Sequence, residues 1–258
     1  MTNNQILIIE EALRANLRNK FQNYNPEPAV MPFHTRLLGR DRLALYSFIQ
    51  SLYTTFGTSI YEPVAKELGS LQFGSALLQQ VSGNLISSEA HRVIQNIMDN
   101  LSTATSMPNK RDETEAIRAV CTQGDMKQVK PTKVDLKLIT HDGTIYLIDI
   151  KTVKPNSGEF KGFKRMLLEW VAATLAINPE ANVHSLIAIP YNPYEPDQYN
   201  RWTMRGMIDL DQELKVANEF WDFVGGAGAY IDLLDIFERV GIELRPEIDD
   251  YFRRFNNN

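Results

Sequence analysis

The chain has 258 residues, 43% of them hydrophobic and 23% charged, which is an ordinary composition for a folded globular protein. A formal net charge of −5 excludes a protein that coats nucleic acid by charge alone, although it does not exclude a local basic patch. The single Cys121 excludes an internal disulfide and a cysteine zinc site, and we expect it to be a packed core thiol. The apolar run 6–9 is too short for a signal peptide or a membrane span, so we expect a cytoplasmic protein.

Helical spacing dominates the first hundred residues. Apolar side chains recur every three or four positions from Ile6 to Leu17, again from Leu43 to Phe56, and in the segment 74–101. Prolines separate the first two runs, and residues 103–112 form a polar connector. We therefore expect a helical front part over residues 1–105.

At Val129 the period changes from helical to alternating, in the sequence VKPTKVDLKLITHDGTIYLIDIKT over residues 129–152. These residues predict two strands around a tight turn. A helix with apolar spacing from 163 to 175 follows, then a short apolar run over 184–190 that predicts a third strand. Residues 202–208 are a candidate for a further strand, and the tail from 213 to 255 is helical in pattern. This order predicts an α/β fold, α+β-like, with a central mixed β-sheet flanked by helices.

The second strand of the pair places charged residues on an apolar face. Leu147, Asp149 and Lys151 share one face because alternate residues of a strand do so. An isolated charge is costly to bury. Asp149 and Lys151 should therefore lie near the end of the sheet, pair with each other, or bind an ion.

The turn decides whether Asp135 joins them. A two-residue turn at 142–143 would place Asp135 opposite Ile150, on the wrong face. A three-residue loop, with Gly143 in the left-handed conformation, pairs Thr140 with Thr144 and places Asp135 opposite Asp149.

In that register two carboxylates face each other, and a divalent cation would relieve their repulsion. Mg²⁺ suits two carboxylates plus water and phosphate oxygens. Lys151 would then hold the attacking water or balance charge on the phosphate. The alternative is a strand end at the surface with an ordinary ion pair.

Other hydrolytic motifs are absent from the sequence. It contains no GxSxG elbow, no GxxxxGK[ST] phosphate loop and no HExxH helix. The four histidines are scattered, and we expect each to be structural.

The spacing of Asp135 and the triplet Asp149-Ile150-Lys151 resembles the PD-(D/E)xK nuclease signature, with Val134 where the first letter is often Pro. The hairpin, the following helix and the third strand are together similar to the nuclease core over residues 113–190. The stretch FGTSIYE (56–62), with Arg205-Gly206 and the later EFW (219–221), resembles the TdeIII/MjaII group of Type II restriction endonucleases.

The resemblance implies a site-specific deoxyribonuclease of a restriction-modification system. Asp135 and Asp149 would bind Mg²⁺, Lys151 would be the catalytic lysine, and Glu62 an additional catalytic acid carried by a helix. The enzyme would cut double-stranded DNA at a short palindrome of the GGNCC kind and leave a 5′-phosphate. Residues 59–62 also fit a capping box, which would make Glu62 a helix cap instead.

Positive charge is concentrated around the predicted site, since residues 110–165 contain twelve Lys or Arg and eight Asp or Glu. We expect basic side chains there to neutralise phosphates and loop side chains to reach base edges. The predicted DNA-binding residues are Lys154, Asn156, Ser157, Lys161, Lys164, Arg165 and Arg205. The alternatives are that Lys164 and Arg165 form the wet face of a helix that buries Trp170, and that Arg205 forms a surface ion pair.

Cutting both strands of a palindrome needs two sites related by a twofold axis, so we expect a homodimer, with a cognate DNA methyltransferase as functional partner. We expect a single domain over residues 1–258. Its parts are a helical DNA-binding or dimerisation part (1–105), the nuclease core (106–208) and a helical tail (209–258). The alternatives are a repair or junction-resolving nuclease with the same core, and a non-catalytic DNA-binding or interaction module.

Overall fold

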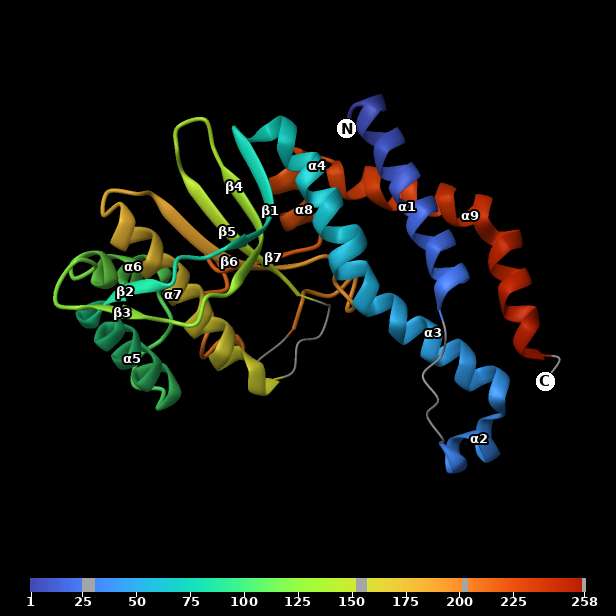
Figure 1. The fold of residues 1–258 in the computed structure, drawn as a ribbon, viewed down its shortest axis with the longest axis horizontal. Coiled ribbons are helices and arrows are strands. Elements are labelled where there is room, and N and C mark those ends of the chain that lie inside the picture. Colours follow the sequence, from blue (N-terminus) through green and yellow to red (C-terminus); the bar gives the residue numbers. More distant parts are fainter. Residues whose placement is uncertain (25–30, 152–156, 201–203, 257–258) are drawn as a thin grey trace.

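The computed structural model describes residues 1–24, 31–151, 157–200 and 204–256. Its centre is a five-stranded sheet (Figure 1). The first three strands in sheet order pair antiparallel and the last three pair parallel, so the predicted mixed sheet is confirmed. The strands, in sheet order, are β1 (Ser75–Val81), β4 (Lys133–Ile139), β5 (Ile145–Ile150), β6 (Val183–Ile189) and β7 (Leu214–Val216). A separate pair is formed by β2 (Leu85–Ser87) and β3 (Met126–Gln128).

Helices cover both faces of the sheet (Figure 1), and each face has its own apolar core. One core is formed with α5 (Ser88–Ser102), α6 (Lys110–Arg118) and α7 (Phe160–Ile177). The other is formed with α1 (Asn3–Asn23), α4 (Glu62–Gln72), α8 (Asn218–Gly225) and α9 (Ala229–Asn256). Two more helices, α2 (Pro32–Leu38) and α3 (Arg40–Phe56), extend away from the sheet beside the end of α9 (Figure 1).

The alternation of the hairpin strands explains the two cores. Leu136, Leu138 and Ile148 are buried towards α4 and α8, whereas Leu147 is buried towards α7. Helix α4 approaches the sheet closely at Gly69, where an added Cβ would lie 2.9 Å from a methyl carbon of Leu138. Helix α4 is thereby packed against the strand that carries Asp135.

Two predictions from periodicity are wrong. The segment 74–101 is not helical throughout, because β1 and β2 precede α5. The tail is not helical from 213, because β7 pairs in parallel with β6. These three strands are short runs whose apolar spacing fits a helix or a strand, and pairing with a distant strand decides between the two.

The prediction of a strand at 202–208 is also wrong for the residues that the structure describes. Residues 201–203 lie outside the described residues, and from Met204 onward the chain forms a helical turn in which Met207 N and Ile208 N donate to Met204 O. By contrast, the predicted hairpin, helix and third strand are confirmed as β4, β5, α7 and β6, and Cys121 is buried as expected.

The sheet takes its edge strands β1 and β7 from outside residues 106–208. Within the described part of the chain, no helix combines the length and apolar character needed to cross a bilayer.

Candidate active site

The hairpin register follows the three-residue loop. Thr140 N donates to Thr144 O at 2.9 Å and Gly143 N to Thr140 O at 3.0 Å, with Gly143 at a φ of 88°. The ladder pairs Leu136 with Ile148, so the next position outward places Asp135 across from Asp149. The three-residue alternative is confirmed and the two-residue turn is wrong.

Asp149, Asp135 and Lys151 form the centre of the candidate site. Asp149 is only 3% exposed, and its Oδ1 accepts a hydrogen bond from Lys151 Nζ at 2.8 Å. Asp135 Oδ2 accepts one from Ile150 N at 2.9 Å, which fixes this carboxylate to the neighbouring strand. Asp149 Oδ2 is buried and has no hydrogen-bond partner among the described residues. A buried carboxylate oxygen with no donor is a place for a ligand that carries positive charge.

Glu62 reaches the same site from a helix. It is the first residue of α4 and is 4% exposed. A π-helical turn, η1 (Gly57–Tyr61), joins α3 directly to α4, and such turns are frequent at functional sites. Ser59 lies inside this continuous helix and no side chain caps α4, so the capping-box alternative for Glu62 is wrong.

Sequence reasoning missed Gln79, which joins Glu62 to Asp135. Gln79 Nε2 donates to Glu62 Oε2 at 2.6 Å and to Asp135 Oδ1 at 3.2 Å. Its φ of 52° is unusual for a residue other than glycine and costs about 1–3 kcal/mol. The sequence signal was two consecutive glutamines at the end of an apolar run, which an assumed helix made unremarkable. We call Glu62, Gln79, Asp135, Asp149 and Lys151 the site cluster.

The site cluster holds more negative charge than its own groups can balance. Burial raises the pKa of Asp149 to about 6, against the lowering effect of Lys151. Burial also raises the pKa of Glu62, with the charge of Asp135 adding to it and the hydrogen bond from Gln79 opposing it. Three carboxylates share Lys151, with the exposed Lys133 as a further charge near Glu62, so an added cation would stabilise the ionised cluster.

The oxygen ligands of the site cluster fit one kind of metal ion. No group of three or more His, Cys, Asp or Glu side chains placed to hold a metal occurs within the described ranges. Mg²⁺, however, is usually bound by one or two carboxylates and keeps water or phosphate oxygens in its other positions. Asp135 and Asp149, with the unpartnered Oδ2, fit that mode of binding.

The predicted DNA-binding residues divide into three groups. Lys154, Asn156 and the side chain of Ser157 lie outside what the structure describes. Lys161 and Arg205 are exposed, and Arg205 lines a hollow of about 370 Å³ with Tyr194, Tyr199, Asp197, Gln198 and Asn200. Arg165 is half-buried, and its Nη2 donates to Gln95 Oε1 at 2.6 Å.

The prediction that Lys164 binds DNA is wrong. It is 0% exposed, and its ammonium bonds Glu113 and Glu213, the latter at 2.6 Å. Lys110 is buried beside it, 2.9 Å from Glu213 Oε1 and 2.7 Å from Ser185 Oγ. Lys110, Glu113, Lys164 and Glu213 are named the core network. Two of the twelve basic residues counted around the site are therefore buried and already paired with carboxylates, and neither is exposed at the surface.

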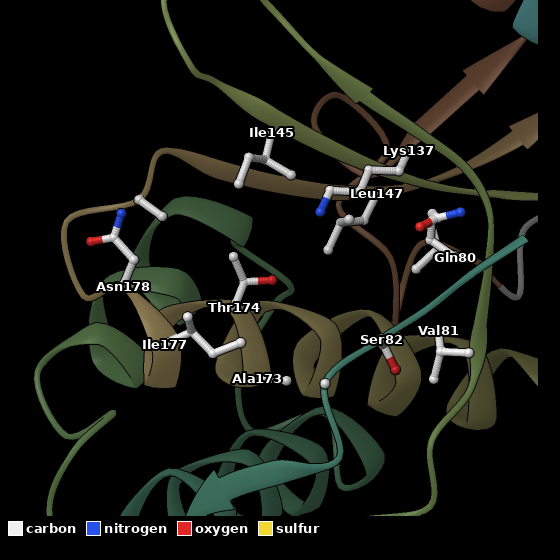
Figure 2. A pocket seen from close by; sticks show the side chains of 13 residues that line it. Gln80, Val81, Ser82, Lys137, Ile145, Leu147, Ala173, Thr174, Ile177 and Asn178 are labelled. Atoms are coloured by element: carbon white, nitrogen blue, oxygen red, sulfur yellow. The ribbon is translucent and has the colours of Figure 1, made fainter. Parts of the chain in front are cut away.

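A cavity of about 270 Å³ lies between the sheet and the C-terminal half of α7. Figure 2 shows Ile145 and Leu147 of β5 facing Thr174 and Ile177 of α7 across it. None of the predicted site residues lines this cavity. The candidate site is therefore the charged end of the hairpin and not this largely apolar space.

A mixed sheet with a facing acidic pair and a lysine on adjoining strands is the arrangement expected of the nuclease class. The model of the family "Type II restriction endonuclease, HinfI" matches residues 1–241, so the chain belongs to that family. It is a Type II restriction enzyme, a site-specific deoxyribonuclease, and this confirms the class expected from its motifs. Enzymes of this family are typically metal-dependent.

Three relatives have similar levels of identity. The Type II restriction enzyme HgiCII of Herpetosiphon aurantiacus is 24% identical over 85% of this chain and 80% of its own length. The Type II restriction enzyme HgiBI of the same organism is 25% identical over 89% of this chain and 86% of its own length. MjaII of Methanocaldococcus jannaschii is 24% identical over 83% of this chain, which spans 59% of that longer protein. The resemblance to the MjaII group is thereby confirmed.

Proposed function

We propose that the enzyme is a Mg²⁺-dependent endonuclease that hydrolyses double-stranded DNA at a short palindrome and leaves a 5′-phosphate. The observation that carries the proposal is the register that sets Asp135 across from Asp149, with Lys151 hydrogen-bonded to Asp149. The target of the GGNCC kind rests on the resemblance to the TdeIII/MjaII group and is part of this proposal.

Asp135 and Asp149 are proposed to hold the metal. When bound, Mg²⁺ would supply positive charge that polarises a phosphate and makes water more acidic. The chain's own groups do the remaining work. Ile150 N–H keeps Asp135 turned into the site.

Lys151 is proposed as the catalytic lysine. Its Nζ lies 2.8 Å from Asp149 Oδ1 and 5.1 Å from the centre of the Phe163 ring. From this position the ammonium would donate to the attacking water or to a phosphate oxygen that gains negative charge. Glu62, as a further acid at the same site, would orient that water.

The DNA contacts are proposed from the exposed residues around the site. Lys154, Lys161 and Arg165 would contact phosphates, whereas Asn156, Ser157 and Arg205 would reach base edges. The position of Arg205 in a hollow lined by polar and tyrosine side chains supports a reading role.

A homodimer is proposed because a palindrome presents each strand to one of two equivalent sites. Large apolar side chains stand exposed along α2 and α3, which supports this face as the contact with a second copy. They include Phe33 (85% exposed), Leu37 (82%), Tyr46 (60%), Tyr53 (52%) and Ile49 (42%). Light scattering of the purified protein and of a Phe33→Ser, Leu37→Ser variant would test it, and a monomeric wild type would overturn it.

We also propose a partner enzyme in the cell and a division of the chain into parts. A cognate DNA methyltransferase would protect host sites in the cytoplasm. One domain is proposed, with residues 1–105 for DNA binding and dimerisation, the nuclease core at 106–208 and the tail at 209–258.

The decisive experiment incubates the enzyme with unmethylated phage DNA, with and without Mg²⁺. Asp135→Ala and Lys151→Ala variants, checked for folding, run beside Glu180→Ala, which removes an exposed carboxylate elsewhere. We expect discrete fragments that need Mg²⁺, persist in Glu180→Ala and disappear in the two site variants. Sequencing the ends gives the target, and ends that map away from GGNCC would overturn that part.

The same experiment includes a branched DNA arm. Intact duplex DNA together with cleaved junctions would favour the repair or junction-resolving nuclease. Fragments that form equally well in both site variants would overturn the assignment of the site.

A further inference from the structure

Strand β1 departs from regular geometry at one residue of the site cluster. Leu78 pairs with Leu136 and Gln80 with Val134, so the register is the same on both sides of Gln79. No extra residue is inserted, yet Gln79 has a φ of 52°, in the left-handed region. A strained residue inside an otherwise regular ladder is a mark of a functional position, because the surrounding structure has to impose it.

The side chain of Gln79 lies between two acids. Its single amide nitrogen donates to Glu62 Oε2 at 2.6 Å and to Asp135 Oδ1 at 3.2 Å. Without this donor, two poorly solvated carboxylates would face each other and repel. A neutral amide reduces that repulsion through hydrogen bonds but adds no charge, so the excess negative charge of the site cluster remains.

The two acids are also fixed without Gln79. Glu62 is 4% exposed in the packed first turn of α4, and Asp135 Oδ2 accepts the hydrogen bond from Ile150 N. Removing the amide would therefore free Glu62 Oε2 and Asp135 Oδ1 while leaving both carboxylates near their present positions.

We propose that Gln79 is a positioning residue whose amide occupies, in the metal-free protein, the Asp135 oxygen needed by the divalent cation that Asp135 and Asp149 would hold. The inference rests on the proposed function. The amide nitrogen and the cation compete for Asp135 Oδ1, so binding of the cation displaces the amide. Gln79 thus lowers the repulsion between the carboxylates of the metal-free site and raises the metal concentration needed to fill it.

The test uses DNA-free protein, so that no cleavage contributes to the reading. Thermal unfolding is followed over a series of Mg²⁺ concentrations for the wild type and for Gln79→Met, which keeps the length and removes the donor. Without Mg²⁺ we expect Gln79→Met to melt at a lower temperature than the wild type. With Mg²⁺ we expect half of the rise in its melting temperature at a Mg²⁺ concentration about tenfold lower than the wild type needs. Gln80→Met is the matched control, because Gln80 Nε2 bonds Leu78 O of its own strand and neither acid of the pair, and it should follow the wild type.

Two further variants sharpen the test. Gln79→Glu adds a third acid beside the pair, so it should melt lowest without Mg²⁺ and respond at the lowest Mg²⁺ concentration. Gln79→Gly adopts a φ of 52° without strain and is the substitute if the methionine variant does not fold.

The outcomes separate the two levels of the argument. In one outcome Mg²⁺ raises the melting temperature of the wild type, but Gln79→Met needs the same or a higher Mg²⁺ concentration for half of its rise. This overturns the role of Gln79 and leaves the proposed function standing. The need for more Mg²⁺ would make the Gln79 carbonyl a ligand. A wild type with no Mg²⁺ response and no Mg²⁺-dependent cleavage overturns both.

Discussion

The core network and the site cluster are both groups of buried charged side chains, but their charges balance differently. In the core network two lysines meet two glutamates, and both ammonium groups lie within hydrogen-bonding distance of a carboxylate. In the site cluster three carboxylates share one lysine and one neutral amide, and Asp149 Oδ2 has no donor within the described part of the chain.

This difference separates a structural cluster from one that fits a ligand. Burying charge is tolerable when each ion is paired and hydrogen-bonded, and the core network meets that condition. The site cluster does not meet it without an added cation. Composition alone does not distinguish them, since both mix acids with lysine, but the local sum of charge does.

The largest expected effect is the loss of Glu213, which accepts from both buried lysines. Glu213→Ala leaves Lys110 and Lys164 short of counter-charge, so we expect the free energy of unfolding to fall by about 3–5 kcal/mol. Urea unfolding measures it, with the exposed Glu180→Ala as control. A loss below about 1 kcal/mol would show that the core network is dispensable.

In the site cluster, removal of one buried carboxylate charge should reduce DNA cleavage and not stability. Asp149→Asn removes a charge that the metal-free protein accommodates poorly, so we expect DNA cleavage to drop by about 10²–10³-fold or more while stability without Mg²⁺ is unchanged or higher. Cleavage rates and urea midpoints of the same preparations test this. A variant that loses stability but keeps its activity would reverse the contrast.

The contribution of Glu213 to the free energy of unfolding should depend on pH. Burial pushes the pKa of Glu213 up, but Lys110 and Lys164 outweigh it and hold the pKa below the ordinary 4.5. A carboxyl of this kind stabilises the fold above its unfolded pKa and loses that contribution as the pH falls through its folded pKa.

We therefore expect the stability difference between wild type and Glu213→Gln to shrink as the pH is lowered below about 4.5. Glu113 faces the same Lys164 and has its pKa raised, by burial first, so Glu113→Gln should show no such shrinkage. Urea unfolding between about pH 3 and pH 6 would reveal it. Parallel curves for wild type and Glu213→Gln would contradict the expectation.

The smallest effect is expected on α7, where Lys161 is exposed and Lys164 is buried. Lys161→Ala should leave stability unchanged, weaken DNA binding modestly and reduce the salt dependence of log K by about 1. Lys164→Met should change stability but not the salt slope. Binding measured in Ca²⁺ at several salt concentrations distinguishes them, and equal slopes for Lys161→Ala and wild type would remove Lys161 from the DNA-binding set.

The hairpin was predictable because its information is local. Gly143 selects the loop, the loop selects the register, and the register brings Asp135 to Asp149. Strand β1 was not predictable in this way, since its partner β4 lies more than fifty residues further along the chain. Gln79 was missed together with its strand.

Lys164 shows a different limit. Its spacing from Leu167, Leu168 and Val171 places it on the buried side of α7, which was a readable signal. A lysine on a buried face is interpretable only when its counter-charges are known. Here they come from Glu113 and Glu213, about fifty residues away on either side.

The unbroken run of α3, η1 and α4 has a mechanical consequence. From Arg40 to Gln72 the chain is a single rod of about 50 Å, with exposed aromatic side chains near one end and Glu62 towards the other. A contact that tilts the outer end of α3 would therefore also shift Glu62, which the same continuous helix carries.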